Sequence, residues 1–503
     1  MRHRLLRAIC IALLPLLLSA CWQDAPPVES SLLPQEEEPS DTGSLSLPEQ
    51  FSLAYAPGES LDPITCADGM QQVVASLLCE GLFRLGPDFE PEPWLCKSYT
   101  YDPVSYTYVF TLYHGITFSD GSFLTSADVK ATLDRARSSE RYGARLSDVT
   151  GITAGSETVT VTLASPNTGF PALLDIPIVK DGTWERPVGT GPYLFSAEDS
   201  GDWLIANQSW WRGAKQPLDR IALVEASDQD TLLYRFSSHD VQLMTADLTG
   251  TTPISATDNV TYLDAGTTVL QYLGCNTTRA PLDDPALRRC LWSGIDRSEL
   301  VSAFFSGHGI ASQFPLSPAS PLYPQELEER YSAASLSSAL SDISGRRPLT
   351  LLVNEENRFK VSAAQQIAKE FTAAGISVSV NALPWAEYTA ALAAGKFDLY
   401  YGEVKLTADW DLTALLGTGG PLNYGGWADP QTDQLLSALS SATDRIGAME
   451  RLCSYLKTQA PILPVCFKST SVLVQANVVD GLKPTMAEPF YNFSDCIVHL
   501  RKT

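Results

Sequence analysis

A strand–helix–strand pattern in the second half of the chain constrains the fold more than any other feature. Residues 349–353 form an apolar run of strand length, and apolar residues from Ala364 to Phe371 then recur at the spacing of one helical face. Gly375 is placed to end that helix, and residues 376–380 alternate apolar side chains with serines, as a strand with one buried face does. Strands joined through a helix are parallel, with a right-handed crossover. The pattern therefore predicts an α/β region built on a parallel sheet.

The same alternation indicates where a binding site belongs. A second helix is predicted from Trp385 to Ala394, and residues 397–401 are predicted to form the next strand. In open parallel sheets the binding crevice lies beyond the carboxyl ends of the strands. The loop that follows Tyr401 is therefore the first place to look for a site.

The first half of the chain is richer in strands. Residues 106–112 and 159–163 alternate β-favouring side chains. Between them, Thr125 and Asp128 have the spacing of a capping box ahead of an amphipathic helix. This half is predicted to be α+β in character.

Acidic and aromatic residues gather after the strand that ends at Tyr401, where the sequence holds Glu403, Asp409, Trp410 and Asp411. Carboxylates beside aromatic rings in a crevice are what a receptor for an ammonium group needs, because they supply a counter-charge and π faces. The alternative is a solvated acidic loop whose aromatic side chains pack inward. A second aromatic loop, residues 423–427 with Tyr424, contains glycines that let a backbone approach a ligand, and it equally fits an ordinary turn.

Composition excludes several classes of function. Of 503 residues, 44% are hydrophobic and 18% are charged, which favours several folded domains over disorder. The formal net charge of -23 disfavours a nucleic-acid partner. The sequence contains no GxxxxGK[ST], GxSxG, HExxH or CxxC motif, so neither a catalytic nucleophile, a cofactor nor a metal site is predicted.

The amino-terminus has the layout of a secretory signal. Three arginines precede an apolar run over residues 8–20, which is shorter than the roughly 20 residues that span a bilayer. Leu18-Ser19-Ala20-Cys21 resembles the bacterial lipobox, in which the cysteine is acylated and anchors the protein to the membrane. The alternative is an ordinary signal peptide with a chance cysteine. Residues 21–50 are acidic and rich in Pro and Ser, and we expect them to form a tether.

Eight of the 10 cysteines remain once Cys10 and Cys21 are assigned to the leader. An exported chain meets oxidising conditions, so some disulfide pairing is expected. The sequence alone does not choose among the possible connectivities.

Eight motifs together resemble bacterial extracellular solute-binding proteins, family 5, the receptors of ABC importers for peptides and nickel. They are FSDGS with LTSADV at 118–129, PVGTGPY at 187–193, NQSWWRG at 207–213, YLGCNT at 272–277, IDR at 295–297, LPWAEY at 383–388, NYGGWAD at 423–429 and APILPV at 460–465. The motifs follow the family's order and extend over most of the chain after residue 50.

The resemblance implies a two-lobed, periplasmic-binding-protein-like receptor with a hinge and a cleft between the lobes. Lobe I would consist of residues 51–266 and 471–503, with a subdomain inserted at about 70–185, and lobe II of residues 267–470. The chain would cross between the lobes near Gly274 and Cys466. Such a receptor makes and breaks no bonds. It would act as a monomer outside the cytoplasm, held at the membrane by its lipid anchor, and would hand short peptides to a permease and its ATPase.

The resemblance also implies the site. In peptide-binding members, an aspartate at the position of Asp409 pairs with the ligand's ammonium group, and Leu406 and Thr407 offer backbone contacts. Glu59 and Ser60 match a ligand loop of the first lobe. The remaining candidates are the neighbouring residues Glu403, Tyr401, Trp410 and Tyr424.

One departure from the family stands beside Asp409. Members commonly have Gly-Trp where this chain has Lys405-Leu406. The lysine could point away, pair with a ligand carboxylate or pair with Glu403. Ligand length and class therefore stay open, and receptors for an opine or a metallophore, a surface peptide hydrolase, a chaperone and a sensor remain alternatives. The five histidines disfavour nickel.

Overall fold

The computed structural model describes residues 47–254, 259–341, 343 and 347–501. The predicted signal peptide, Cys21 and most of the expected tether lie outside the described residues. The body from Leu47 to Thr503 forms one compact unit. Within the described part of the chain, none of the helices combines the length and apolar character that crossing a membrane requires.

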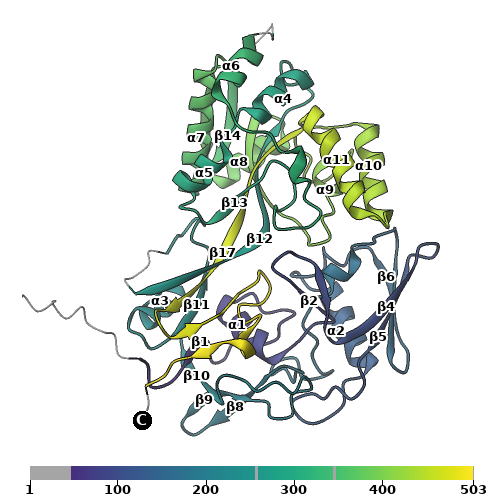
Figure 1. The fold of residues 1–503 in the computed structure, drawn as a ribbon, viewed down its shortest axis with the longest axis vertical. Coiled ribbons are helices and arrows are strands. Elements are labelled where there is room, and N and C mark those ends of the chain that lie inside the picture. Colours follow the sequence, from purple (N-terminus) through teal and green to yellow (C-terminus); the bar gives the residue numbers. More distant parts are fainter. Residues whose placement is uncertain (1–46, 255–258, 342, 344–346, 502–503) are drawn as a thin grey trace, which may run out of the picture. The chain divides into compact units, whose positions relative to one another are not determined.

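One eleven-stranded sheet runs through the body (Figure 1). Its order is β15-β14-β16-β12-β17-β11-β1-β10-β9-β8, and β13 (Gly309–Ala311) pairs with β17. The strands at the β8 end are β1 (Ser52–Tyr55), β8 (Tyr193–Glu198), β9 (Gly201–Ala206), β10 (Arg220–Glu225) and β11 (Leu243–Ala246). Helix α1 (Gly69–Leu78) follows β1 in the chain, and helix α3 (Gln229–Ser237) connects β10 to β11.

Two long antiparallel strands, β12 (Val260–Cys275) and β17 (Ile462–Gln475), connect the two ends of this sheet. β12 and β17 pair with each other along their length, the last part of β17 pairs with β11, and the last part of β12 pairs with β16. The change falls where the β12–β17 register shifts between Gly266 and Leu270. This is a few residues earlier than the expected crossing near Gly274, because β16 already pairs with β12 from Val269 onward.

The β15 end of the sheet confirms the predicted strand–helix–strand pattern. Strand β14 (Leu349–Asn354), helix α7 (Arg358–Ala373) and strand β15 (Val378–Leu383) follow in that order, and the strands are parallel. Helix α8 (Trp385–Ala393) then leads to β16 (Leu399–Lys405), which is parallel to β14. The other α-helices of this half are α4 (Pro285–Ser293), α5 (Arg297–Phe304), α6 (Ala333–Ser341), α9 (Thr413–Leu416), α10 (Pro430–Ser441) and α11 (Arg445–Gln459). Two short 3-10 helices are η2 (Gln325–Leu327), between α5 and α6, and η3 (Phe493–Asp495), near the carboxyl end of the chain.

The predicted α+β character of the first half is also present. A separate four-stranded antiparallel sheet has the order β4-β5-β7-β6 and consists of β4 (Cys96–Asp102), β5 (Thr107–Leu112), β6 (Val149–Ala154) and β7 (Thr158–Leu163). Helix α2 (Ser126–Arg137) begins at the predicted capping box, in which Thr125 and Asp128 exchange side-chain and backbone hydrogen bonds. The remaining short elements are β2 (Phe83–Leu85), β3 (Pro91–Pro93), η1 (Phe170–Leu173), β18 (Val479–Asp480) and β19 (Ile497–Val498).

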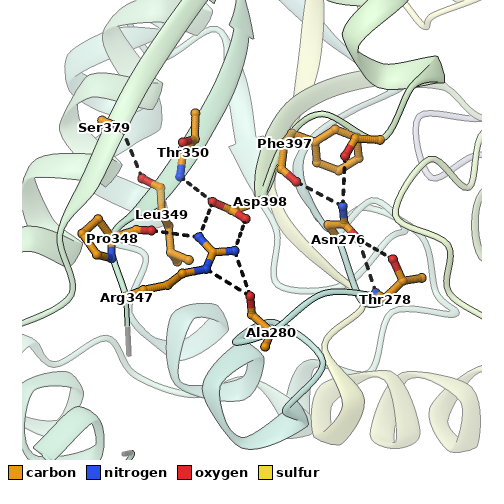
Figure 2. A network of polar contacts seen from close by, with 11 residues as sticks. Asn276, Thr278, Ala280, Arg347, Pro348, Leu349, Thr350, Ser379, Phe397 and Asp398 are labelled. Atoms are coloured by element: carbon orange, nitrogen blue, oxygen red, sulfur yellow. Dashed lines mark hydrogen bonds and ion pairs between the residues drawn. The ribbon is translucent and has the colours of Figure 1, made fainter. Parts of the chain in front are cut away.

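A buried ion pair fixes the beginning of β16 (Figure 2). The Arg347 guanidinium donates to both carboxylate oxygens of Asp398, at 2.9 and 2.6 Å. The Thr350 N–H donates to the same carboxylate at 2.9 Å, and Arg347 also donates to the Ala280 carbonyl at 2.8 Å. Burial raises the pKa of Asp398, but these hydrogen bonds outweigh it and leave the pKa below its ordinary value. The charge at this end of β16 is therefore neutralised within one half of the sheet.

The expectation of disulfide pairing is not met at seven of the eight cysteines of the body. These seven are free thiols: Cys66, Cys79, Cys96, Cys275, Cys453, Cys466 and Cys496. Most of them are buried among apolar side chains, where a cysteine behaves as a small hydrophobe. They therefore contribute to core packing and not to cross-linking.

Candidate ligand-binding site

The acidic loop follows β16, and it begins beside the part of β12 where the β12–β17 register shifts. The last residue of β16, Lys405, lies opposite Val269 of β12. The Leu406 N–H donates to the Thr268 carbonyl at 2.9 Å, and the Thr268 hydroxyl donates to the Leu406 carbonyl at 2.6 Å. Because β12 shifts register just before Val269, residues 406–411 begin at the junction of the two halves of the sheet.

The Asp409 carboxylate is buried and bonded across this junction, with 4% of the residue exposed. One of its oxygens accepts from the Asn167 side-chain amide at 2.7 Å, and Asn167 lies in the segment between β7 and η1. The other oxygen accepts from the Thr407 hydroxyl and, at 3.5 Å, from the Asp411 N–H. A carboxylate has about four acceptor positions. One position on the oxygen that faces Asn167 is therefore left for a further donor.

The segment around Asn167 is docked on the second half of the chain by further contacts. The Thr168 N–H donates to the Ser440 carbonyl of α10 at 2.8 Å. Arg445, the first residue of α11, donates to the Asp409 carbonyl and lies against Gly169, where an added Cβ would come within 2.4 Å of the guanidinium. Burial lowers the pKa of Arg445, and the negative charge of Asp409 partly offsets that effect. A side chain at residue 169 would separate these two segments.

The aromatic candidates in this loop pack inward. The Trp410 ring is 1% exposed and meets Phe89 and Phe467 edge to face, with centroids 5.3 and 5.8 Å away. Its backbone φ of 57° is unusual for so large a residue, a form of strain that concentrates at functional sites. Tyr401 is also buried, and its carbonyl accepts from the Tyr388 hydroxyl at 2.7 Å. Both rings are buried in the core and help to hold the loop in place.

Glu403 already has cationic partners. Its carboxylate lies 3.1 Å from the Lys360 ammonium of α7 and 3.8 Å from that of Lys468 in β17. Gln271 of β12 donates to the same carboxylate, and Lys468 pairs in addition with Asp247 at 2.6 Å. Glu403 therefore belongs to an internal charge network that ties β16 to its neighbours.

Tyr424 is placed away from Asp409. Its ring meets that of Tyr400 at 6.0 Å, near the beginning of β16, whereas the Asp409 loop follows the end of this strand. The predicted close approach of Gly425 is to protein, since an added Cβ would lie 2.1 Å from the Cys275 carbonyl oxygen. The structure does not bring these two candidate loops together.

Glu59 and Ser60 lie in the loop that follows β1. The Glu59 N–H donates to the Ala56 carbonyl at 3.2 Å, and the Ser60 hydroxyl accepts from the Asp62 N–H at 3.1 Å. Glu59 lies near enough to Cys66 to raise the pKa of that thiol, after the larger effect of burial. The Cys66 carbonyl accepts a hydrogen bond from the Arg141 guanidinium at 3.3 Å.

Sequence reasoning missed Asn167, Arg141 and Arg145. Lys405 is an exposed residue whose pKa is lowered by partial burial and, to a smaller extent, by the positive charges of Arg141 and Arg145. The available signal was weak: an acidic chain with a run of arginines at 135, 137, 141 and 145. Nothing in the sequence connects that run with Lys405, more than 250 residues further along the chain. Across the described ranges, no group of three or more His, Cys, Asp or Glu side chains could hold a metal ion.

The fold is that of the two-lobed periplasmic binding proteins. A nickel ABC transporter structure from Bacillus halodurans superposes with a TM-score of 0.74 at 20% identity, covering 88% of this chain and 98% of that one. The murein tripeptide binding protein MppA, in its unliganded open form, superposes with a TM-score of 0.74 at 17% identity, covering 90% and 98%.

The family model described as bacterial extracellular solute-binding proteins, family 5 Middle, matches residues 90–420, and the chain belongs to this family. The glutathione-binding protein GsiB of Pectobacterium atrosepticum is 27% identical over 456 residues, which cover 83% of this chain and 88% of the relative. Matches to several other GsiB proteins cover 52% of their length. The resemblance inferred from the eight motifs is thereby confirmed.

Proposed function

We propose that this protein is the receptor of an ABC importer, and that it captures a short peptide between its lobes and delivers it to a membrane permease. The observation that carries the proposal is the Asp409 carboxylate, which lies at the lobe junction, is bonded to Asn167 and keeps an acceptor position. Two proteins similar to this chain are named for short peptides, glutathione and a murein tripeptide.

The mechanism follows from the sheet. Among the described strands, only β12 and β17 continue from the strands assigned to the first lobe to those assigned to the second, so a bend at their register shift would open and close the cleft. A ligand that touches both lobes favours the closed form by the difference between its affinities for the two forms. Converting a mostly open population into a mostly closed one takes about 5.5 kcal/mol of such difference.

Within the cleft, Asp409 would hold the peptide's ammonium group, and the backbone of Leu406 and Thr407 would bind the extended peptide. Glu59 and Ser60 would contribute from the first lobe. Trp410 and Tyr401 would act indirectly, by packing in the core and holding the loop in place. The receptor would work outside the cytoplasm, anchored through an acylated Cys21.

Replacing Asp409 by Asn tests this assignment. Asp409→Asn keeps the shape and a hydrogen-bonding side chain but removes the counter-charge, so tripeptide affinity should fall by roughly thirtyfold or more. Isothermal titration calorimetry with trialanine and with its N-acetylated form measures the effect, and wild-type protein should reject the acetylated form.

Asp411→Asn is the matched control. Asp411 is exposed and accepts from the Thr413 N–H at 2.9 Å, so its replacement should leave affinity within about twofold. Equal affinities for wild type and Asp409→Asn would refute the role of Asp409.

A further inference from the structure

The turn between β2 and β3, residues 86–90, carries a phenylalanine that is buried among residues of the second half of the chain. Phe89 is 3% exposed, and its ring meets that of Trp410 edge to face with centroids 5.3 Å apart. It belongs to the same buried apolar cluster as Leu270 of β12. Its ring also lies against Gly266, where an added Cβ would be 3.7 Å from the Phe89 Cζ. Phe89 therefore reaches the part of β12 where the β12–β17 register shifts.

Both rings of this contact are carried by a strained backbone. The φ angle is 67° at Phe89 and 57° at Trp410, in the left-handed region that disfavours large side chains. Such conformations persist where the surrounding contacts fix them, and they concentrate at functional sites. A glycine at residue 89 would remove the strain in the turn but also the ring. The chain therefore accepts backbone strain on both sides of a contact that joins its two halves.

Three successive residues in the segment between β7 and η1 make a second contact with the same loop. The Asn167 side-chain amide donates to the Asp409 carboxylate at 2.7 Å, and the Thr168 N–H donates to a carbonyl of α10 at 2.8 Å. Gly169 lies against the guanidinium of Arg445, which donates to the Asp409 carbonyl. Asp409 is therefore bonded to the segment through its side chain and through the arginine that packs on Gly169.

The Asn167 side chain is held in place from its own side of the junction. Its amide oxygen accepts from the Gly169 N–H at 2.9 Å, which directs the amide nitrogen towards Asp409. The Asn167 carbonyl accepts from the hydroxyl of Tyr108 at 2.7 Å, and Tyr108 is buried in the core of the four-stranded sheet. The donor that meets Asp409 is therefore oriented by the subdomain expected at about residues 70–185.

Every group in these two contacts belongs to the chain itself, so the contacts do not depend on a bound solute for their formation. A bend at the register shift of β12 and β17 that separated the lobes would break the apolar contact and the hydrogen bonds together. The contacts therefore favour the closed form. Each hydrogen bond is exchanged for bonds to water on opening, so the net bias is modest and the lobes can still separate.

We propose that Phe89 and residues 167–169 form a latch, by which the inserted subdomain holds the lobes together and positions Asp409 before a solute binds. This inference rests on the proposed function, since it assigns positioning residues to the site that contains Asp409. The apparent affinity of a receptor falls in proportion to the fraction of molecules in the binding-competent form. A latch that raises this fraction raises the affinity without touching the solute.

Small-angle X-ray scattering of the full mature chain, without any peptide, tests the latch. Gly169 has an ordinary φ of -89°, so Gly169→Ala fits the backbone, but the added methyl group must displace the Arg445 guanidinium. Phe89→Gly removes the ring at a φ that suits glycine. Both variants should have a larger radius of gyration than wild type at an unchanged melting temperature. Gly151→Ala is the matched control, because a Cβ there meets no described atom within 4 Å, and it should scatter like wild type.

A double-mutant cycle identifies the group that the methyl displaces. In an Arg445→Ala background, Gly169→Ala should cause no further expansion, because the guanidinium is gone. An equal further expansion there would contradict the contact between these two residues.

Calorimetry with trialanine connects the latch to binding. Gly169→Ala and Phe89→Gly should each weaken affinity by about fivefold, and Gly151→Ala should not. If wild type does not bind trialanine but the scattering differences are present, the proposed peptide function fails and the latch stands. Equal radii of gyration for wild type, Gly169→Ala and Phe89→Gly without peptide overturn the latch.

Discussion

The two ends of strand β16 handle charge in opposite ways. Just before the strand begins, Asp398 is buried and receives two hydrogen bonds from Arg347 and one from Thr350 (Figure 2). At its last residue, Lys405 is exposed and forms no ion pair within the described residues, and its pKa is lowered by burial and by the positive charges of Arg141 and Arg145. The difference indicates that a charge with a buried partner stabilises the fold, whereas an exposed charge without an ion pair contributes little to stability.

The largest effect on the free energy of unfolding should come from removing the cation of the Arg347–Asp398 ion pair. Arg347→Met leaves the Asp398 carboxylate buried without its cation, and we expect a loss of about 3 kcal/mol in the free energy of unfolding. Urea denaturation measures it. Arg220→Met, which removes an exposed pair with Glu198, is the control and should cost less than about 1 kcal/mol. Similar losses in the two variants would show that the Asp398 pair is no more than a surface contact.

Acid should remove the same contribution more gradually. The pKa of Asp398 is lower in the folded chain than the ordinary value of about 3.9. The folded state therefore holds its proton less tightly than the unfolded state does, so the stabilisation is complete above the unfolded pKa and is lost as the pH falls through the folded pKa. Urea denaturation between about pH 6 and pH 3 should show the gap between wild type and Arg347→Met narrowing as the pH falls. A gap that is constant with pH would contradict this assignment.

The smallest effect on the free energy of unfolding, with the opposite sign, should come from replacing Lys405 at the last residue of β16. Lys405→Met removes a charge whose pKa is lowered by burial and by two arginines, so stability should stay within about 0.5 kcal/mol of wild type, on the stabilising side. Thermal melts measure this change. A marked loss of stability would mean that Lys405 supports the fold, and the contrast between the two ends of β16 would fail.

Part of the site could be predicted from the sequence because it depends on short-range order. The period of the apolar residues located α7, β15 and β16, and hence the loop that carries Asp409. The Thr125 and Asp128 capping box located α2 in the same way. The residues that contact that loop could not be predicted from the sequence, since Asn167 and Asp409 are 242 residues apart. No local pattern signals such a pair.

Residue type alone also left the partners of some side chains open. Glu403 and Trp410 fit an ammonium receptor by chemistry, yet Glu403 meets lysines from α7 and β17, and Trp410 packs between Phe89 and Phe467. Seven cysteines that suggested disulfides are free thiols in the folded chain. In each case the chemistry of a side chain was clear, but its partner was decided elsewhere in the chain.

The sequence by itself determined the family, the alternation of strands and helices and the loop in which a charged site belongs, because hydrophobic period, capping and motif order are local properties. Only the tertiary structure decided which charges are balanced. Ion pairing depends on which distant segments the long strands β12 and β17 bring together, and burial at that junction sets the cost of every charge left alone. The Lys405 ammonium shows this dependence, since the two arginines that lower its pKa lie more than 250 residues earlier in the chain.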